Sequence, residues 1–250
     1  MPRFLIKIEY DGTNYAGWQR QDNGITVQGC LEDAANIING NRGHVLVYGA
    51  GRTDAGVHAT GQAAHLDLHA NFNEHKLPLA LNAHLPRDIR VSKSTLMPDK
   101  FHARFDAIGR SYLYRILPRR IGTALDYSRV WHIYHPLDAA AMNDAAQRLV
   151  GHHDFTSFRA THCQASSPEK TIDHLSVFQD GECIAITTSA RSFLHHQVRN
   201  ITGTLVQVGL GKWTADDVTA ALNARNRAAA GPTAPAHGLY LTDVIYPAMD

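Results

Sequence analysis

The sequence has few cysteines, no long apolar run and almost no net charge. Its three cysteines include no C-x-x-C pair, which argues against both a disulfide framework and a thiolate zinc site. No apolar run approaches the ~18 residues of a membrane span, and the first residues lack the anatomy of a signal peptide. These absences indicate a soluble, cytoplasmic protein that has no membrane partner.

The net charge of +1 conceals an uneven distribution of basic residues. Residues 100–130 contain seven lysines or arginines and two aspartates. Such a stretch is typical of a surface that contacts phosphates. A solvated basic face without a partner is equally consistent with the charge alone.

Hydrophobic periodicity predicts alternating strands and helices in the first half of the chain. Apolar residues recur at every second position over 4–10 and at helical spacing over 27–38. The same patterns predict strands at 44–48, 62–68 and 88–96 and a second helix at 74–84. The order β-α-β-β-α-β is the ferredoxin-like arrangement that RNA-recognition folds also use.

The second half of the chain repeats this mixture of strands and helices. Strands are predicted at 109–117, 130–134 and 238–246, a hairpin at 172–178 and 183–188 around Asp180-Gly181, and helices at 138–150, 192–208 and 215–224. Residues 228–235 are small and predict a linker or flexible loop. The predicted fold class is therefore α+β, with two ferredoxin-like halves whose largely antiparallel sheets are flanked by helices. We place the domain boundary after residue 108, which gives domains of 1–108 and 109–250.

The most informative segment is the glycine-rich string Y-G-A-G-R-T-D-A-G-V-H at 48–58. A dinucleotide fingerprint starting at Gly49 would need glycine where Asp54 stands, and a P-loop starting at Gly51 would need lysine at Val57. What remains is an acidic side chain between glycines, which let the backbone turn sharply and let a substrate approach closely. A purely structural turn, in which Asp54 caps its own backbone, is the alternative.

The string G-R-T-D-A-G-V-H at 51–58 resembles the signature of the tRNA pseudouridine synthase A family. Further strings resemble that family in the same order, at 8–12, 17–21, 101–105, 110–114, 154–159 and 193–200. Each string alone is weak evidence, whereas their joint order is highly specific. Ser111 departs from the pattern, since relatives often carry a second arginine there.

The resemblance implies an enzyme that isomerises uridine to pseudouridine at positions 38, 39 and 40 in the anticodon stem-loop of tRNA. It also implies a homodimer and an active-site cleft between the two halves. Residue by residue, it makes Asp54 the catalytic aspartate, Arg199 the basic residue paired with it, and Arg52 the arginine linked to base flipping. Tyr112 matches the tyrosine that stacks on the target base, and we expect His58 and Arg110 to contribute to substrate binding.

The chemistry of the reaction agrees with these assignments. Pseudouridine formation breaks the N-glycosidic bond, turns the uracil and rejoins it through C5, so that we expect no cofactor and no metal. An ionised carboxylate can attack the base or the sugar, or stabilise a cationic sugar, and an adjacent arginine favours the ionised form. The 16 histidines include no H-E-x-x-H string, which leaves a metal site without support.

Two other classes of function remain open from the sequence. A non-catalytic RNA-binding module of the same topology would not need Asp54, and an acid in a phosphate-binding groove is a liability unless it performs chemistry. A nucleoside or glycoside hydrolase would favour a second carboxylate opposed to the first. No such carboxylate stands out near Asp54 in the sequence, and Asp11 is more typical of a turn cap.

Overall fold

The computed structural model describes residues 1–40, 42–161 and 163–248. Unit 1 consists of Met1–Ile108 together with the chain from Tyr240 onward, and unit 2 consists of Gly109–Leu239. Each unit combines helices with mostly antiparallel strands, so the predicted α+β fold class is confirmed. The last strand, which we grouped from the sequence with 109–250, lies in unit 1 because it pairs there with a strand far away in the sequence.

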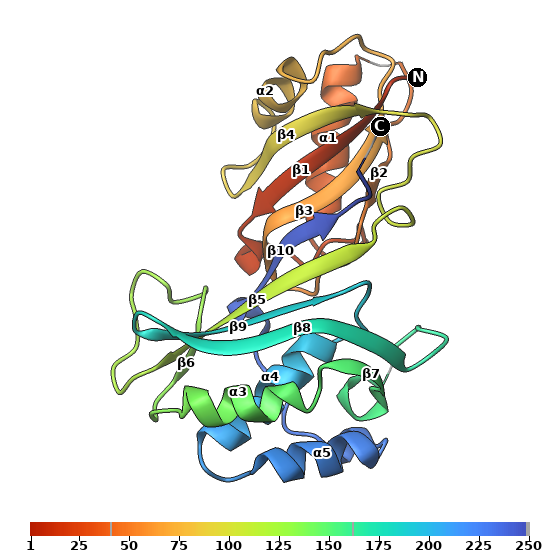
Figure 1. Cartoon of the computed structure of the whole chain (residues 1–250). Coiled ribbons are helices and arrows are strands. Elements are labelled where there is room, and N and C mark those ends of the chain that lie inside the picture. Colours follow the sequence, from red (N-terminus) through yellow and green to blue (C-terminus); the bar gives the residue numbers. More distant parts are fainter. Residues whose placement is uncertain (41, 162, 249–250) are drawn as a thin grey trace. The chain divides into compact units, whose positions relative to one another are not determined.

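Unit 1 has the predicted order β-α-β-β-α-β. Its elements are β1 (Arg3–Tyr10), α1 (Val27–Asn39), β2 (Val47–Gly49), β3 (His58–Asp67), α2 (Lys76–Asn82) and β4 (Ile89–Met97), followed late in the chain by β10 (Leu239–Ile245). The strands run in the order β4-β1-β3 (Figure 1). Both β2 and β10 pair with β3, β2 antiparallel at Leu66 and β10 parallel at His58.

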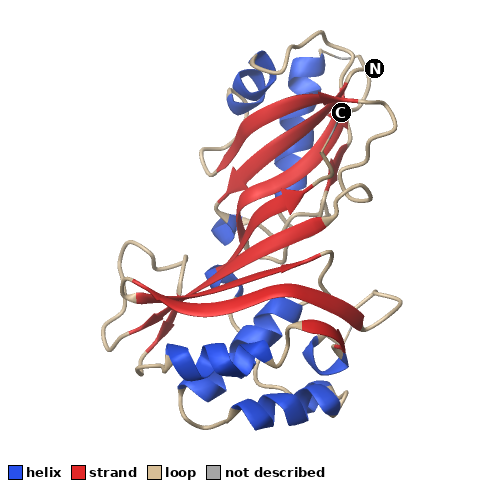
Figure 2. Ribbon diagram, viewed as in Figure 1, coloured by secondary structure: helices blue, strands red, loops and turns tan. Residues whose placement is uncertain are grey.

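Local signals explain why these segments fold as they do. Alternate residues of β1 are buried (Phe4, Ile6, Ile8 and Tyr10), which confirms the period-two prediction. The Thr26 side chain caps α1 by accepting a hydrogen bond from the Gly29 amide, and Gly40 ends the helix in the left-handed conformation at φ 62°. The helices α1 and α2 lie on one side of the unit 1 sheet (Figure 2).

Unit 2 combines mostly antiparallel strands with three α-helices among its described residues. Its elements are β5 (Gly109–Pro118), β6 (Trp131–Ile133), α3 (Ala139–Gln147), β7 (Gly151–Asp154), β8 (Glu169–Asp180), β9 (Cys183–Ala190), α4 (Gln197–Gly209) and α5 (Ala215–Asn223). The strands β5-β9-β8-β7 are antiparallel neighbours, whereas β6 pairs in parallel with β5. The sequence predicts all of these elements except the short strand β7.

Two segments of unit 2 differ from their predicted structure. The helix expected from 192 begins only at Gln197, because His196 has a left-handed backbone with φ 62°. The segment 228–235 packs closely against α4 and is not a free linker. A Cβ on Gly203 would lie 1.7 Å from the Pro232 carbonyl oxygen, so the small residues allow the two backbones to meet.

Among the helices of the described ranges, none has both the length and the apolar character needed to cross a bilayer.

Candidate active site

Asp54 lies on the loop that joins β2 to β3 in unit 1. It is half-buried, whereas Arg52 on the same loop is exposed and Thr53 is buried. The Val57 amide donates a hydrogen bond of 3.1 Å to the Asp54 carbonyl oxygen, which closes a main-chain turn. Gly56 occupies the left-handed region of this turn at φ 77°. The spacing of aspartate and glycine in the sequence therefore builds a tight turn that begins at Asp54.

Hydrogen bonds hold the residues just before Asp54 in place. The Tyr10 hydroxyl lies 2.7 Å from the Thr53 hydroxyl, and the Trp18 amide donates to the Thr53 carbonyl oxygen at 3.0 Å. The Gln62 side-chain amide donates to the Gly51 carbonyl oxygen at 3.0 Å. A reactive group carried by a supported backbone is pre-organised, and this loop has such support.

Glycines let the N-terminal segment approach this loop. A Cβ on Gly12 would lie 2.0 Å from the Val57 carbonyl oxygen, and one on Gly49 would lie 2.5 Å from the Trp18 ring. A Cβ on Gly17 would lie 2.7 Å from the Thr53 carbonyl oxygen. The strings at 8–12, 17–21 and 51–58, which the sequence singles out separately, thus meet at one place in unit 1.

His58 ends the same loop but is only 2% exposed. Its Nδ1 lies 3.0 Å from the Gly12 amide, which donates to it, and 3.1 Å from the Asp11 carboxylate. The Tyr240 ring stacks on the imidazole at a centroid distance of 4.8 Å. This burial suits a residue that holds the loop more than one that touches substrate. Asp11 itself caps the turn at Thr13, whose amide donates to its carboxylate at 3.0 Å.

In unit 2, β5 presents two tyrosines with different environments. Tyr114 is fully buried, donates a hydrogen bond of 2.7 Å to the Pro235 carbonyl oxygen, and has its pKa raised by burial. Tyr112 is half-buried, with its ring perpendicular to Phe193 at a centroid distance of 5.2 Å. Tyr114 is therefore a core residue, and Tyr112 is the more accessible ring. Arg110, on the same strand, donates to the Arg191 carbonyl oxygen at 2.7 Å.

Arg199 lies in the first turn of α4 and is half-buried. Its Nε donates a hydrogen bond of 2.8 Å to the Ala234 carbonyl oxygen, while the Ala234 amide donates to the Arg199 carbonyl oxygen at 3.1 Å. These two hydrogen bonds attach the segment 228–235 to α4 and restrict the position of the Arg199 side chain. The residues assigned from the sequence thus fall into two sets, with Arg52, Asp54 and His58 in unit 1 and Arg110, Tyr112 and Arg199 in unit 2.

The residues that support the Asp54 loop were not identified from the sequence. Gln62 and Thr53 have relative exposures of 0% and 7%, although both are polar. A polar side chain at a buried position of a strand pattern is a signal that could have found Gln62, because buried polar groups need hydrogen-bond partners. Nothing local marks Thr53, whose partner Tyr10 is distant in sequence.

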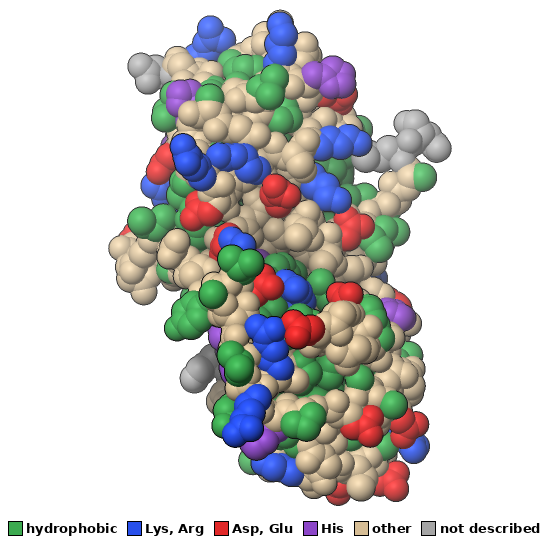
Figure 3. Space-filling model, turned by 90° about the vertical axis from the view of Figure 1, so that its left-hand side faces the viewer, with side chains coloured by type: hydrophobic (Ala, Val, Ile, Leu, Met, Phe, Trp, Pro, Cys, Tyr) green, Lys and Arg blue, Asp and Glu red, His purple; other side chains and the backbone are tan. Residues whose placement is uncertain are grey.

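The basic stretch 100–130 is mostly on the surface. Lys100 and Arg120 are exposed, whereas Arg119 pairs with Glu182 at 2.6 Å and Arg115 lies 3.8 Å from Asp126. On the face shown in Figure 3, arginine and lysine side chains stand among apolar ones. Two of the arginines in this stretch, Arg115 and Arg119, therefore lie next to carboxylates of the protein itself, which offset part of the positive charge that we expect to contact phosphates.

Comparison with known proteins identifies the family. A family model described as tRNA pseudouridine synthase matches residues 6–106 and 145–247. Proteins named tRNA pseudouridine synthase A from Afipia carboxidovorans, Rhodopseudomonas palustris (strain BisA53) and Rhodospirillum centenum are each 56% identical over 247 residues. Each match covers 98% of this chain and 100% of the relative. These matches favour an RNA-modifying isomerase over the non-catalytic module, and the chain belongs to the tRNA pseudouridine synthase family.

Proposed function

We propose that the protein isomerises uridine to pseudouridine at positions 38, 39 and 40 in the anticodon stem-loop of tRNA. The observation that carries the proposal is the supported Asp54 loop in a chain that matches named tRNA pseudouridine synthases over its whole length. The proposal includes a homodimer, which the family resemblance implies. It also places the protein in the cytoplasm, because its substrate is tRNA.

The reaction is an isomerisation in which atoms and electrons balance. The bond between N1 of uracil and C1′ of ribose breaks, a bond between C5 and C1′ forms, the proton on C5 leaves, and N1 gains a proton. An ionised Asp54 attacks the base or the sugar, or stabilises a cationic sugar, and is regenerated at the end. No external electron acceptor enters this balance.

The other assigned residues act on binding and on charge. Extrusion of the target base from its stack costs a few kcal/mol, and the accessible Tyr112 ring is a suitable surface to receive it. Arg52 is exposed on the Asp54 loop, where it can contact the substrate backbone as the base leaves. Arg199 contributes positive charge that favours the ionised aspartate, and Arg110 contributes to substrate binding. We assign His58 a role in holding the loop.

Release of tritium from tRNA that carries 5-tritiated uridine tests the proposal. We expect wild type to release tritium without free uracil, and Asp54→Asn to fold, bind tRNA and release none. Asp22→Asn, which changes an exposed aspartate outside the assigned site, is the matched control and is expected to keep full activity. Residual activity of Asp54→Asn above about 1% of wild type would contradict its role, since loss of an essential covalent catalyst costs several orders of magnitude.

The same assay separates the alternative functions. Free uracil would indicate a hydrolase, and binding without release of tritium would indicate a non-catalytic module. Transcripts with a single uridine at position 38, 39 or 40 test the positional part, because each modified uridine is mapped independently. Sedimentation equilibrium of the full chain tests the dimer.

A further inference from the structure

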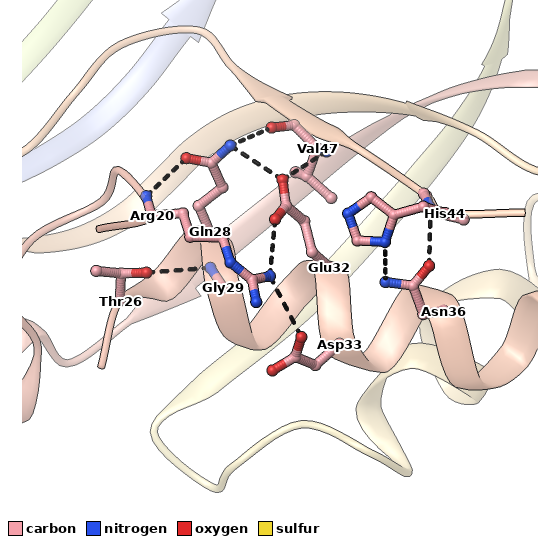
Figure 4. Close-up of polar contacts among 10 residues, drawn as sticks. Arg20, Thr26, Gln28, Gly29, Glu32, Asp33, Asn36, His44 and Val47 are labelled. Atoms are coloured by element: carbon pink, nitrogen blue, oxygen red, sulfur yellow. Dashed lines mark hydrogen bonds and ion pairs between the residues drawn. The ribbon is translucent and has the colours of Figure 1, made fainter. Parts of the chain in front are cut away.

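Glu32 is a buried carboxylate on α1 that the proposed chemistry does not use. Its side chain is 2% exposed. It accepts hydrogen bonds from Arg20 Nη1 at 3.0 Å, Gln28 Nε2 at 3.1 Å and the Val47 amide at 3.2 Å (Figure 4). A buried charge is costly unless it is paired and hydrogen-bonded. This carboxylate meets that condition with donors from different parts of the chain.

These donors connect separate segments. We call Arg20, Gln28, Glu32 and Val47 the Glu32 clasp. Within it, the Gln28 side chain also accepts from the Arg20 amide at 2.9 Å and donates to the Val47 carbonyl oxygen at 2.9 Å (Figure 4). The clasp therefore ties the start of β2 to the segment 17–21, with α1 as the support.

Both tied segments lead directly to the Asp54 loop. Val47 begins β2, which runs into that loop, and Trp18 donates its amide to the Thr53 carbonyl oxygen at 3.0 Å. The Trp18 ring also lies against Gly49 at the end of β2. A shift of the clasp is thus transmitted through one short strand and one hydrogen bond to the residue before Asp54.

We propose that Glu32 is a positioning residue for catalysis, which holds the Asp54 loop in its reactive geometry through Arg20 and Val47. This inference rests on the proposed function of Asp54. Displacement of a reacting group by about 1 Å can reduce a rate by about 100-fold. Asp33, the next residue on α1, offers a contrast. It also meets Arg20, at 3.3 Å, but its side chain is 68% exposed, and exposed ion pairs contribute little.

The test compares Glu32→Gln with Asp33→Asn in the full-length protein. Glutamine keeps the shape of the side chain but replaces one acceptor oxygen with a donor, so at least one bond of the clasp is lost. We expect the single-turnover rate constant for tritium release to fall about 10- to 100-fold in Glu32→Gln, while the Kd for tRNA changes less than about twofold. Asp33→Asn is expected to keep both values within about twofold of wild type.

A stability-matched control separates positioning from general loosening of the fold. Val218 is fully buried on α5 in unit 2, so Val218→Ala lowers Tm without touching the clasp. We expect Val218→Ala to keep the wild-type rate constant at a temperature where all variants are folded. A Glu32→Gln protein that also keeps the wild-type rate would overturn the inference. The inference would also fail if Glu32→Gln and Val218→Ala lost the same Tm and both lost rate by the same factor.

A second variant covers the case in which Glu32→Gln does not fold. The Arg20 side chain is 51% exposed. Arg20→Gln therefore removes one hydrogen-bond donor to the Glu32 carboxylate without changing a buried side chain. We expect a rate loss of at least about threefold, again with unchanged Kd, and a wild-type rate would overturn the inference. An inactive wild-type protein would instead contradict the proposed function, so the two failures are distinguishable.

Discussion

Replacement of Gly17 by alanine should disturb the Asp54 loop directly. Gly17 has φ 100°, a backbone conformation that L-residues rarely adopt, and its Cβ would lie 2.7 Å from the Thr53 carbonyl oxygen and 3.2 Å from the Ala55 amide. Gly181, in the turn between β8 and β9, offers a matched control. It also has positive φ, at 59°, but a Cβ there would meet no heavy atom within 4 Å.

The two substitutions share one energetic cost and differ in the other. Alanine in the left-handed region costs about 1–2 kcal/mol, and this is the whole expected cost at Gly181. At Gly17 the added contact with main-chain atoms brings a further cost of about 1–3 kcal/mol for overpacking. We therefore expect Gly17→Ala to lower the free energy of unfolding by about 2–5 kcal/mol, more than Gly181→Ala.

Urea unfolding and single-turnover tritium release measure the two consequences. Since the crowded atoms flank Asp54, we expect the rate constant of Gly17→Ala to fall about 100-fold and that of Gly181→Ala to stay at the wild-type value. Equal losses of stability in the two variants, together with a wild-type rate in Gly17→Ala, would refute the close approach of this segment to the loop.

Two further predictions concern groups held by the fold. Burial of His65 lowers its pKa from 6.5 to about 4, with the Ala103 amide donating to Nδ1. Because the unfolded chain binds more protons in this range, the free energy of unfolding should fall as the pH is lowered from 6.5 to 4, by at most about 1.4 kcal/mol per pH unit. Urea unfolding at several pH values measures this fall. If His65→Asn shows the same fall as wild type, His65 is not its origin. Arg199→Ala should lower both Tm and the rate of tritium release, because the hydrogen bond to Ala234 is lost; unchanged Tm in a thermal melt would argue against that anchoring.

Much of the fold follows from local pattern. The alternation over β1, the helical spacing closed by Gly40, and the turn residues Asp180-Gly181 each act within a few residues, where backbone preferences and side-chain direction are decided. The same holds for the turn at Asp54, since its hydrogen bond and the left-handed Gly56 lie within four residues.

Other features depend on segments far apart in the chain. The helix α4 starts later than its pattern predicts because His196 has a left-handed backbone, and the small residues of 228–235 pack on α4 instead of forming a free linker. The period-two pattern of β5 places Tyr112 and Tyr114 on one face, but only the packing shows that Tyr114 is core and Tyr112 more accessible.

Local sequence patterns are enough to predict the order of the elements apart from β7, the α+β class and the family motifs, including the aspartate at the centre of the proposed chemistry. Tertiary structure alone decided that β10 pairs with β3, that His58 is buried beneath Tyr240, and that Glu32 joins Arg20 to Val47. The physical reason is that periodicity and turn chemistry act over a few residues. Burial and hydrogen bonding of a polar side chain depend instead on which distant backbone comes to lie against it.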